Sequence, residues 1–205
     1  MTDGTGKREL NKARKRAAIV EAATRSFFEQ GYATTSMSAI AEELGCSKAT
    51  LWSHFPSKEA LFEAVIDAQV EVFSRDIDEV LTSRTFTLER LRSASQRFLE
   101  SLLRRRSIEL FRLVLSEGER FPEISEAFYQ RGPAKVRKFI CDFFGTAFLP
   151  DDADRLAQAY IAALTGYRSD ILLRPVKPTR AERDAFIENL IAIFDWPAHK
   201  DGLDI

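Results

Sequence analysis

The segment from residue 35 to residue 55 constrains the fold more than any other part of the chain. Its first half predicts a short helix, because apolar residues recur at i, i+3, i+4 and i+7, namely at Met37, Ile40, Ala41 and Leu44. Gly45 follows as the left-handed residue that ends such a helix, and Ser47 is suited to cap a second one. Leu51 and Phe55 are the inward positions of that second helix. We therefore predict two short helices joined by a tight turn.

The outward face of the second predicted helix is short, polar and aromatic, and it consists of Lys48, Ala49, Thr50, Trp52, Ser53 and His54. A helix-turn-helix places such a face in the major groove of DNA, with its N-terminal end first. The alternative is a helical hairpin buried in an all-α core. A core hairpin has no need of an outward row of hydrogen-bond donors, so the sequence favours DNA binding.

The charge distribution agrees with a nucleic-acid partner at one end of the chain. The 205 residues have a formal net charge of −1, but residues 1–16 hold six Lys or Arg against two acidic residues. The basic run is either a solubilising tail or a set of phosphate contacts. Its position directly before the predicted helix-turn-helix favours phosphate contacts.

Every ordered segment has the periodicity of a helix, so we predict an all-α protein. Nine helices are expected, with a short additional one over 123–131 between the sixth and the seventh. The expected ranges are about 10–30, the pair within 35–55, 57–82, 86–106, 107–117, 133–147, 151–173 and 179–195. The helix over 57–82 is long enough to join a DNA-reading end to a distant body as one rigid rod.

The pattern of residues 10–62 resembles the DNA-binding domain of tetracycline-repressor (TetR) family regulators. The resemblance rests on Gly31-Tyr32, Thr35-Ser36-Met37, Ile40-Ala41, Gly45, Ser47 to Leu51 and Phe55 to Leu61. It implies a helix-turn-helix domain over 10–57 and a helical ligand-binding and dimerisation domain over 58–197. The stretch from Arg112 to Pro133 also resembles, more weakly, the ligand domain of several efflux and stress regulators.

The resemblance and the residue chemistry together assign a set of DNA contacts. Lys48 can reach a phosphate or a guanine, Thr50 a base edge, and the Ala49 methyl group a thymine methyl group. Thr35 or Ser36 caps the first short helix and can also donate to a phosphate. The full set of expected DNA-binding residues is Thr35, Ser36, Ser47, Lys48, Ala49, Thr50, Trp52, His54 and Lys58. His54 is alternatively an exposed residue that makes no contact.

The many Phe residues of the body have two interpretations. Most must pack in the core, but the family resemblance implies that some line an apolar cavity for a small molecule. The candidates are Phe98, Leu102, Phe111, Leu115, Phe128, Phe139 and Phe143. The last two helices expose more apolar surface than one chain can cover, which favours a four-helix homodimer interface. The alternative is that they complete the core of a single chain.

These observations predict a ligand-responsive dimeric regulator, usually a repressor, that binds a palindromic operator in double-stranded DNA. A constitutive DNA-binding dimer is the alternative. A helical enzyme is disfavoured, because the sequence has two histidines and neither a nucleophile elbow nor a phosphate-binding glycine loop. No metal or other cofactor is expected. Two distant cysteines and the lack of an apolar span or signal peptide favour a cytoplasmic protein without a membrane partner.

Overall fold

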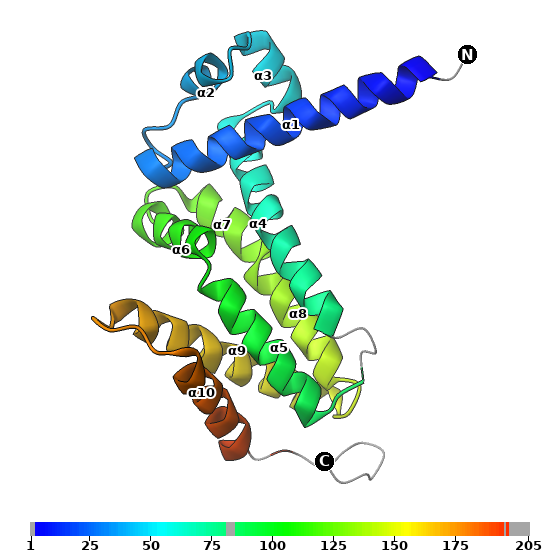
Figure 1. The fold of residues 1–205 in the computed structure, drawn as a ribbon, viewed down its shortest axis with the longest axis vertical. Helices are drawn as coiled ribbons and strands as arrows, with labels where there is room; N and C mark the ends of the chain where they lie inside the picture. Colours follow the sequence, from blue (N-terminus) through cyan, green and yellow to red (C-terminus); the bar gives the residue numbers. More distant parts are fainter. Residues whose placement is uncertain (1–2, 81–84, 195, 197–205) are drawn as a thin grey trace. The chain divides into compact units, whose positions relative to one another are not determined.

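The computed structural model describes residues 3–80, 85–194 and 196, and within these residues it contains helices and no strand. The helices are α1 (Asp3–Gln30), α2 (Met37–Glu43), α3 (Lys48–His54), α4 (Lys58–Val80), α5 (Leu88–Leu102), α6 (Arg105–Glu117), α7 (Pro122–Arg131), α8 (Pro133–Phe144), α9 (Pro150–Leu173) and α10 (Arg180–Ile193). The short additional helix predicted over 123–131 is α7, so the seventh to ninth predicted helices carry the labels α8 to α10 (Figure 1). The all-α fold is confirmed.

The chain forms two compact units that do not follow one another along the sequence. Unit 1 comprises Met1–Val70 and Glu109–Gly132, and unit 2 comprises Glu71–Ile108 and Pro133–Ile205. The chain passes from one unit to the other within α4, within α6 and between α7 and α8. The last part of α6 and all of α7 therefore belong with the helix-turn-helix, although they lie far from it in sequence.

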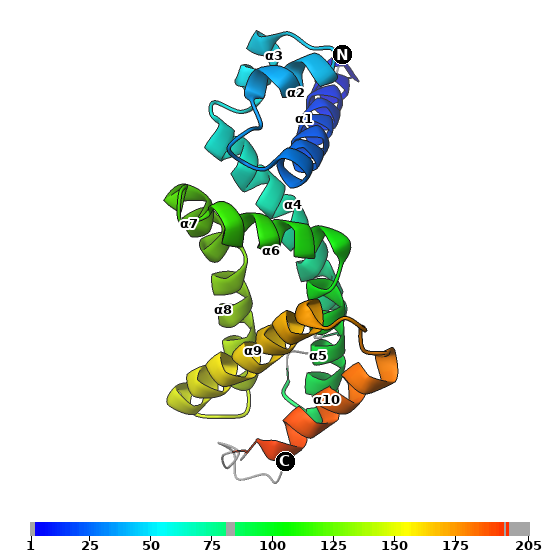
Figure 2. The ribbon, with the colours of Figure 1, turned by 90° about the vertical axis from the view of Figure 1, so that its left-hand side faces the viewer.

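The core of unit 1 forms around α1, which supplies Ile19, Ala23 and Phe27, each 0% exposed. Leu51 of α3 and Leu61 of α4 are equally buried in the same cluster, which Leu110, Leu113 and Ile124 join from α6 and α7. The helix-turn-helix packs on α1 through α2, which contacts both α1 and α3 (Figure 2). Side chains that are buried on this scale stabilise the folded unit by about 1.5–3 kcal/mol each.

The core of unit 2 is rich in aromatic rings. Phe86 lies 5.0 Å from Phe148 and 5.3 Å from Phe143, measured between ring centroids, and Trp196 lies within 6.2 Å of Phe144 and Phe148. Helix α9 crosses α8 and α5, and α10 contacts α5 (Figure 2). Ring pairs at such distances add about 0.5–1.5 kcal/mol beyond the area that they bury.

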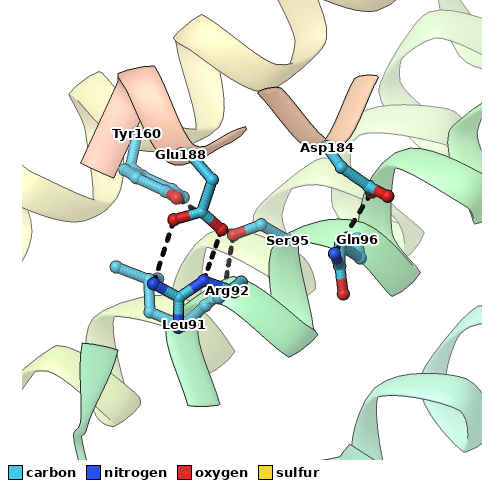
Figure 3. A network of polar contacts seen from close by, with 7 residues as sticks. All are labelled: Leu91, Arg92, Ser95, Gln96, Tyr160, Asp184 and Glu188. Carbon is cyan, nitrogen blue, oxygen red and sulfur yellow. Dashed lines mark hydrogen bonds and ion pairs between the residues drawn. The ribbon is translucent and has the colours of Figure 1, made fainter. Parts of the chain in front are cut away.

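A polar network joins α5 to α9 and α10 inside unit 2 (Figure 3). The Ser95 hydroxyl donates to the Leu91 carbonyl at 2.6 Å and shares a 3.0 Å hydrogen bond with the hydroxyl of Tyr160. Burial raises the pKa of Tyr160 to about 12, so this hydroxyl stays protonated near neutral pH. Arg92 pairs with both carboxylate oxygens of Glu188, and the Gln96 amide donates to Asp184. The network fixes how the last helix packs on α5.

Candidate functional site

The exposed face of α3 is set by its N-cap and by two inward residues, one within the helix and one directly after it. Ser47 is the N-cap, with φ −68° and ψ 150°, and its hydroxyl oxygen accepts from the backbone N–H of Thr50 at 3.1 Å. Leu51 and Phe55 are 0% and 2% exposed, so both are inward as predicted. The opposite side of α3 presents Lys48, Ala49, Trp52 and Ser53 to solvent.

Two of the predicted contact residues on α3 have partners within the helix. The hydroxyls of Ser47 and Thr50 lie 2.8 Å apart, and the Ser53 hydroxyl donates to the Thr50 carbonyl at 2.7 Å. Trp52 is 46% exposed, which leaves much of the indole ring at the surface. This face therefore combines a cation, a methyl group, hydroxyls and an aromatic ring over two turns of helix. Such groups contact base edges and phosphates in protein–DNA complexes.

The turn between α2 and α3 has the geometry that the sequence predicts. Gly45 adopts φ +57°, and its backbone N–H donates to the Glu42 carbonyl at 3.0 Å. The next backbone N–H, that of Cys46, donates to the Ala41 carbonyl at 3.0 Å. The left-handed backbone conformation costs glycine little free energy, whereas it costs other residues about 1–2 kcal/mol.

The turn before α2 buries one of the predicted contact residues. Thr35 is 2% exposed, and its hydroxyl donates to the Gly31 carbonyl at 2.8 Å and lies 3.1 Å from the Ser26 hydroxyl. A hydroxyl enclosed in this way has little surface left for a phosphate, so Thr35 is left out of the interface proposed below. Ser36 is the actual N-cap of α2, accepts from the Ala39 N–H at 3.1 Å, and is exposed.

Lys58, at the start of α4, contacts the same turn with its side chain. Its ammonium group donates to the Ala33 carbonyl at 3.3 Å and lies 4.4 Å from the centre of the Tyr32 ring. Partial burial lowers the pKa of Lys58. Lys58 therefore has a structural role in unit 1 that the sequence did not predict.

An open groove of about 550 Å³ lies between the N-terminal part of α1 and the end of α3, and it is lined by Arg8, Glu9, Lys12, Ser53 and His54. The sequence predicted α1 to begin near residue 10. In the structure α1 begins at Asp3, so Arg8 and Lys12 share one helix face four residues apart. The four-residue spacing of these two basic residues is the feature of the sequence from which this groove beside His54 could have been predicted.

The residues predicted to line a ligand cavity fall into both units. In unit 2, Phe98 and Phe143 are 5% and 3% exposed in the aromatic core, and Leu102 and Phe139 pack partly buried against it. The unit 1 members are Phe111, Leu115 and Phe128. Phe128 packs against the unit 1 core, whereas Leu115 is 67% exposed, which does not fit a cavity wall. Within the residues described, no group of three or more His, Cys, Asp or Glu side chains is placed to hold a metal ion.

The last two helices serve both the core and the surface. Ile187, Leu190 and Ile191 of α10 are buried in the core of unit 2, so this side of α10 completes the single chain. Other positions are exposed, namely Ala159, Ala162 and Gly166 on α9 and Ala185, Asn189, Ala192 and Ile193 on α10. A Cβ atom added at Gly166 would meet no atom within 4 Å, and Ile193 is 76% exposed. In the described part of the chain, no helix is both long and apolar enough to cross a bilayer.

Comparison with known proteins agrees with this geometry. Residues 19–65 match the family model of bacterial regulatory proteins of the tetR family, and residues 89–195 match the C-terminal domain model of AefR-like transcriptional repressors. Among curated proteins, the transcriptional activator FasR of Mycolicibacterium smegmatis is 32% identical over 91 residues, which are 44% of this chain and 42% of FasR. The transcriptional regulator RutR of Escherichia coli K12 is 40% identical over 77 residues, 36% of each chain. The chain thus matches less than half the length of these two relatives.

Solved structures match over more of the chain. The flavonoid-responsive regulator FrrA superposes with a TM-score of 0.74 at 32% identity, over 86% of this chain and 92% of FrrA. A protein from Mesorhizobium loti MAFF303099, described as a TetR-family regulator, also gives a TM-score of 0.74, at 26% identity over 89% of this chain and 97% of the other. The relatives are transcription regulators and not enzymes. The exposed, capped α3 on an all-helical scaffold and these matches together show that the chain belongs to the tetR family of DNA-binding bacterial regulatory proteins.

Proposed function

We propose that this protein is a homodimeric repressor that binds a palindromic operator and is released by a small apolar or amphipathic molecule. The observation that carries the proposal is the outward face of α3, where Lys48, Ala49 and Trp52 are exposed around a helix whose other side is buried. Ser36, Ser47, Thr50 and His54 complete the proposed interface. Lys58 is kept as a secondary contact, because its ammonium group also holds the turn at Ala33.

The groove beside α3 supports an additional, sequence-independent contact. Arg8 and Lys12 face it together with Glu9 and His54, so a DNA strand that passes the end of α3 would meet two cations and one carboxylate. Each neutralised phosphate releases counterions, which makes such a contact depend on salt and not on base sequence. The basic start of the chain is therefore proposed to bind phosphates rather than to act as a tail.

The Lys48→Ala substitution tests the proposed base reading. It is expected to weaken binding to the cognate operator by about 5- to 150-fold, since a good base contact is worth ~1–3 kcal/mol. Binding is measured by fluorescence anisotropy on operator and random duplexes at one salt concentration. Lys135→Ala, which removes the same charge from an exposed position on α8, is the matched control. Unchanged operator affinity in a Lys48→Ala protein with normal thermal stability would exclude this reading of α3.

A small-molecule effector is supported by the aromatic residues of the body and by the similarity to FrrA and to AefR-like repressors. Phe98, Leu102, Phe139 and Phe143, which all belong to unit 2, are the proposed sources of ligand contacts. Binding coupled to operator release is reciprocal, with typical factors of 5–150.

A panel of flavonoids is the first probe of this effector proposal. A flavonoid that binds the body is expected to raise the melting temperature of the protein and to release it from operator DNA. Thermal shift and anisotropy measure the two effects on the same preparation. If flavonoids and a broad set of apolar compounds change neither quantity, the constitutive DNA-binding dimer is the better function.

A further inference from the structure

The turn that leads from α1 into α2 is held by a side chain from a distant part of the sequence. Glu117 is the last residue of α6, and its two carboxylate oxygens accept from two consecutive backbone N–H groups. Oε1 lies 2.8 Å from the nitrogen of Tyr32, and Oε2 lies 2.8 Å from the nitrogen of Ala33. Hydrogen bonds to an ionised acceptor are shorter and stronger than neutral ones. The carboxylate therefore satisfies two donors that would otherwise need water.

The side chains around this turn reduce its freedom further. Tyr32 is 2% exposed, its ring packs between Phe27 and Phe121 at 5.6 and 5.2 Å, and its hydroxyl donates to Glu59 at 3.3 Å. The ammonium group of Lys58 holds the Ala33 carbonyl. The turn is thus enclosed by α4, α6 and the residues at the start of α7, all within unit 1.

Gly31 shows that the position of the carboxylate is built into the sequence. This residue has φ +90°, and a Cβ atom added to it would lie 2.5 Å from Oε1 of Glu117. The glycine therefore provides both the backbone conformation of the turn and the space that the carboxylate occupies. The absence of a side chain at Gly31 thus complements the Glu117 carboxylate. The two residues are far apart in sequence, since 85 residues separate Glu117 from Tyr32, which follows Gly31.

The turn determines where α2 begins. The Gly31 carbonyl accepts from the hydroxyl and the backbone N–H of Thr35, and Ser36 directly after it caps α2. Helix α2 in turn contacts α3, which carries the outward face. A loosened turn would leave the α2–α3 pair in several arrangements, and apparent affinity falls in proportion to the fraction that is competent to bind.

We propose that Glu117 is a positioning residue for operator recognition, which acts by holding the backbone of Tyr32 and Ala33. The proposal rests on the DNA-binding function proposed above. Glu117 touches no base or phosphate in this scheme. Its contribution is to keep the α2–α3 pair in the one arrangement that fits DNA, at the point where α6 ends.

The test compares Glu117→Gln and Glu117→Ala with the native protein. The glutamine side chain keeps one acceptor oxygen but turns an N–H₂ group toward the other backbone donor, and alanine removes both acceptors. We expect operator affinity to fall by about tenfold or more in Glu117→Ala and by less in Glu117→Gln, because hydrogen bonds to charged groups are among the stronger ones. Glu119→Gln, which removes an exposed charge two residues further on, should leave the affinity unchanged.

Amide hydrogen exchange, measured without DNA, gives a second readout that does not depend on DNA binding. Exchange of the Tyr32 and Ala33 amides is expected to accelerate in both Glu117 variants, with folding confirmed by circular dichroism. Faster exchange with native operator affinity would overturn the proposal and leave Glu117 a purely structural brace. Unchanged exchange would also overturn it, because the carboxylate would not be holding the turn. If the native protein binds no operator but exchange responds as expected, the proposed DNA-binding function is wrong, although Glu117 does hold the turn.

Discussion

Replacing Ile193 by aspartate is expected to separate the proposed dimer into monomers and to weaken operator binding by about 10²- to 10⁴-fold. Ile193 is 76% exposed on α10 in the single chain, where water can hydrate a new carboxylate. In a dimer built on the exposed faces of α9 and α10, that carboxylate would be buried without a partner. Loss of the dimer removes the simultaneous binding of two half-sites, so the loss on the full operator greatly exceeds that on one half-site.

Sedimentation equilibrium and anisotropy on full and half operators measure these two effects. Leu115→Asp is the matched control, because Leu115 is 67% exposed but lies on α6 in the other unit. Leu190→Asp is not an equivalent variant, although the sequence pattern treats both residues alike. Leu190 is 5% exposed in the core of unit 2, so its substitution should unfold the single chain. A native dimer in the Ile193→Asp protein would place the interface on another surface.

The Gly31→Ala substitution is expected to destabilise unit 1 strongly. Alanine at φ +90° is strained by about 1–2 kcal/mol. Its Cβ atom would also displace the Glu117 carboxylate, and losing hydrogen bonds to a charged group costs a further ~1.5–3 kcal/mol. For a chain of this size, the sum lowers the melting temperature by roughly 5–20 °C. Differential scanning calorimetry measures the change.

Gly45→Ala separates the two contributions. Gly45 also has a positive φ, +57°, but a Cβ atom there would meet nothing within 4 Å, so only the backbone strain applies. Combining Gly31→Ala with Glu117→Ala completes a double-mutant cycle, in which the clash disappears and the two effects should not add. Equal losses for Gly31→Ala and Gly45→Ala would mean that the carboxylate moves aside without cost.

The helix-turn-helix was predictable because its signals are local. The apolar spacing of α2, the left-handed Gly45 and the capping Ser47 all act within a few residues, and each has the predicted geometry. The family resemblance has the same origin, since most of its residues lie within this segment. The all-helical body was also readable from periodicity, which depends on neighbours within two turns.

The features that the sequence did not show depend on how side chains of different elements pack. Thr35 and Ser36 have the same capping chemistry in sequence, and only packing against Ser26 and Gly31 turns Thr35 inward. Leu190 and Ile193 both belong to an apolar run, but the core of unit 2 covers only Leu190. The partner of Glu117 lies 85 residues away, and no periodicity connects them. The predicted boundary near residue 57 likewise did not anticipate that 109–132 would join the first unit.

The positions of the two tryptophans have a spectroscopic consequence. Trp52 lies half-exposed on the outward face of α3, whereas Trp196 stacks on Phe148 and Phe194 in unit 2 and donates its indole N–H to the Ile191 carbonyl at 3.1 Å. Because the sequence holds no other tryptophan, each unit carries one indole, which can be excited at wavelengths where the tyrosines do not absorb. Replacing either one by phenylalanine leaves a single tryptophan. Emission from Trp52 then reports what approaches the recognition helix, and emission from Trp196 reports the packing of the aromatic core, without any attached label.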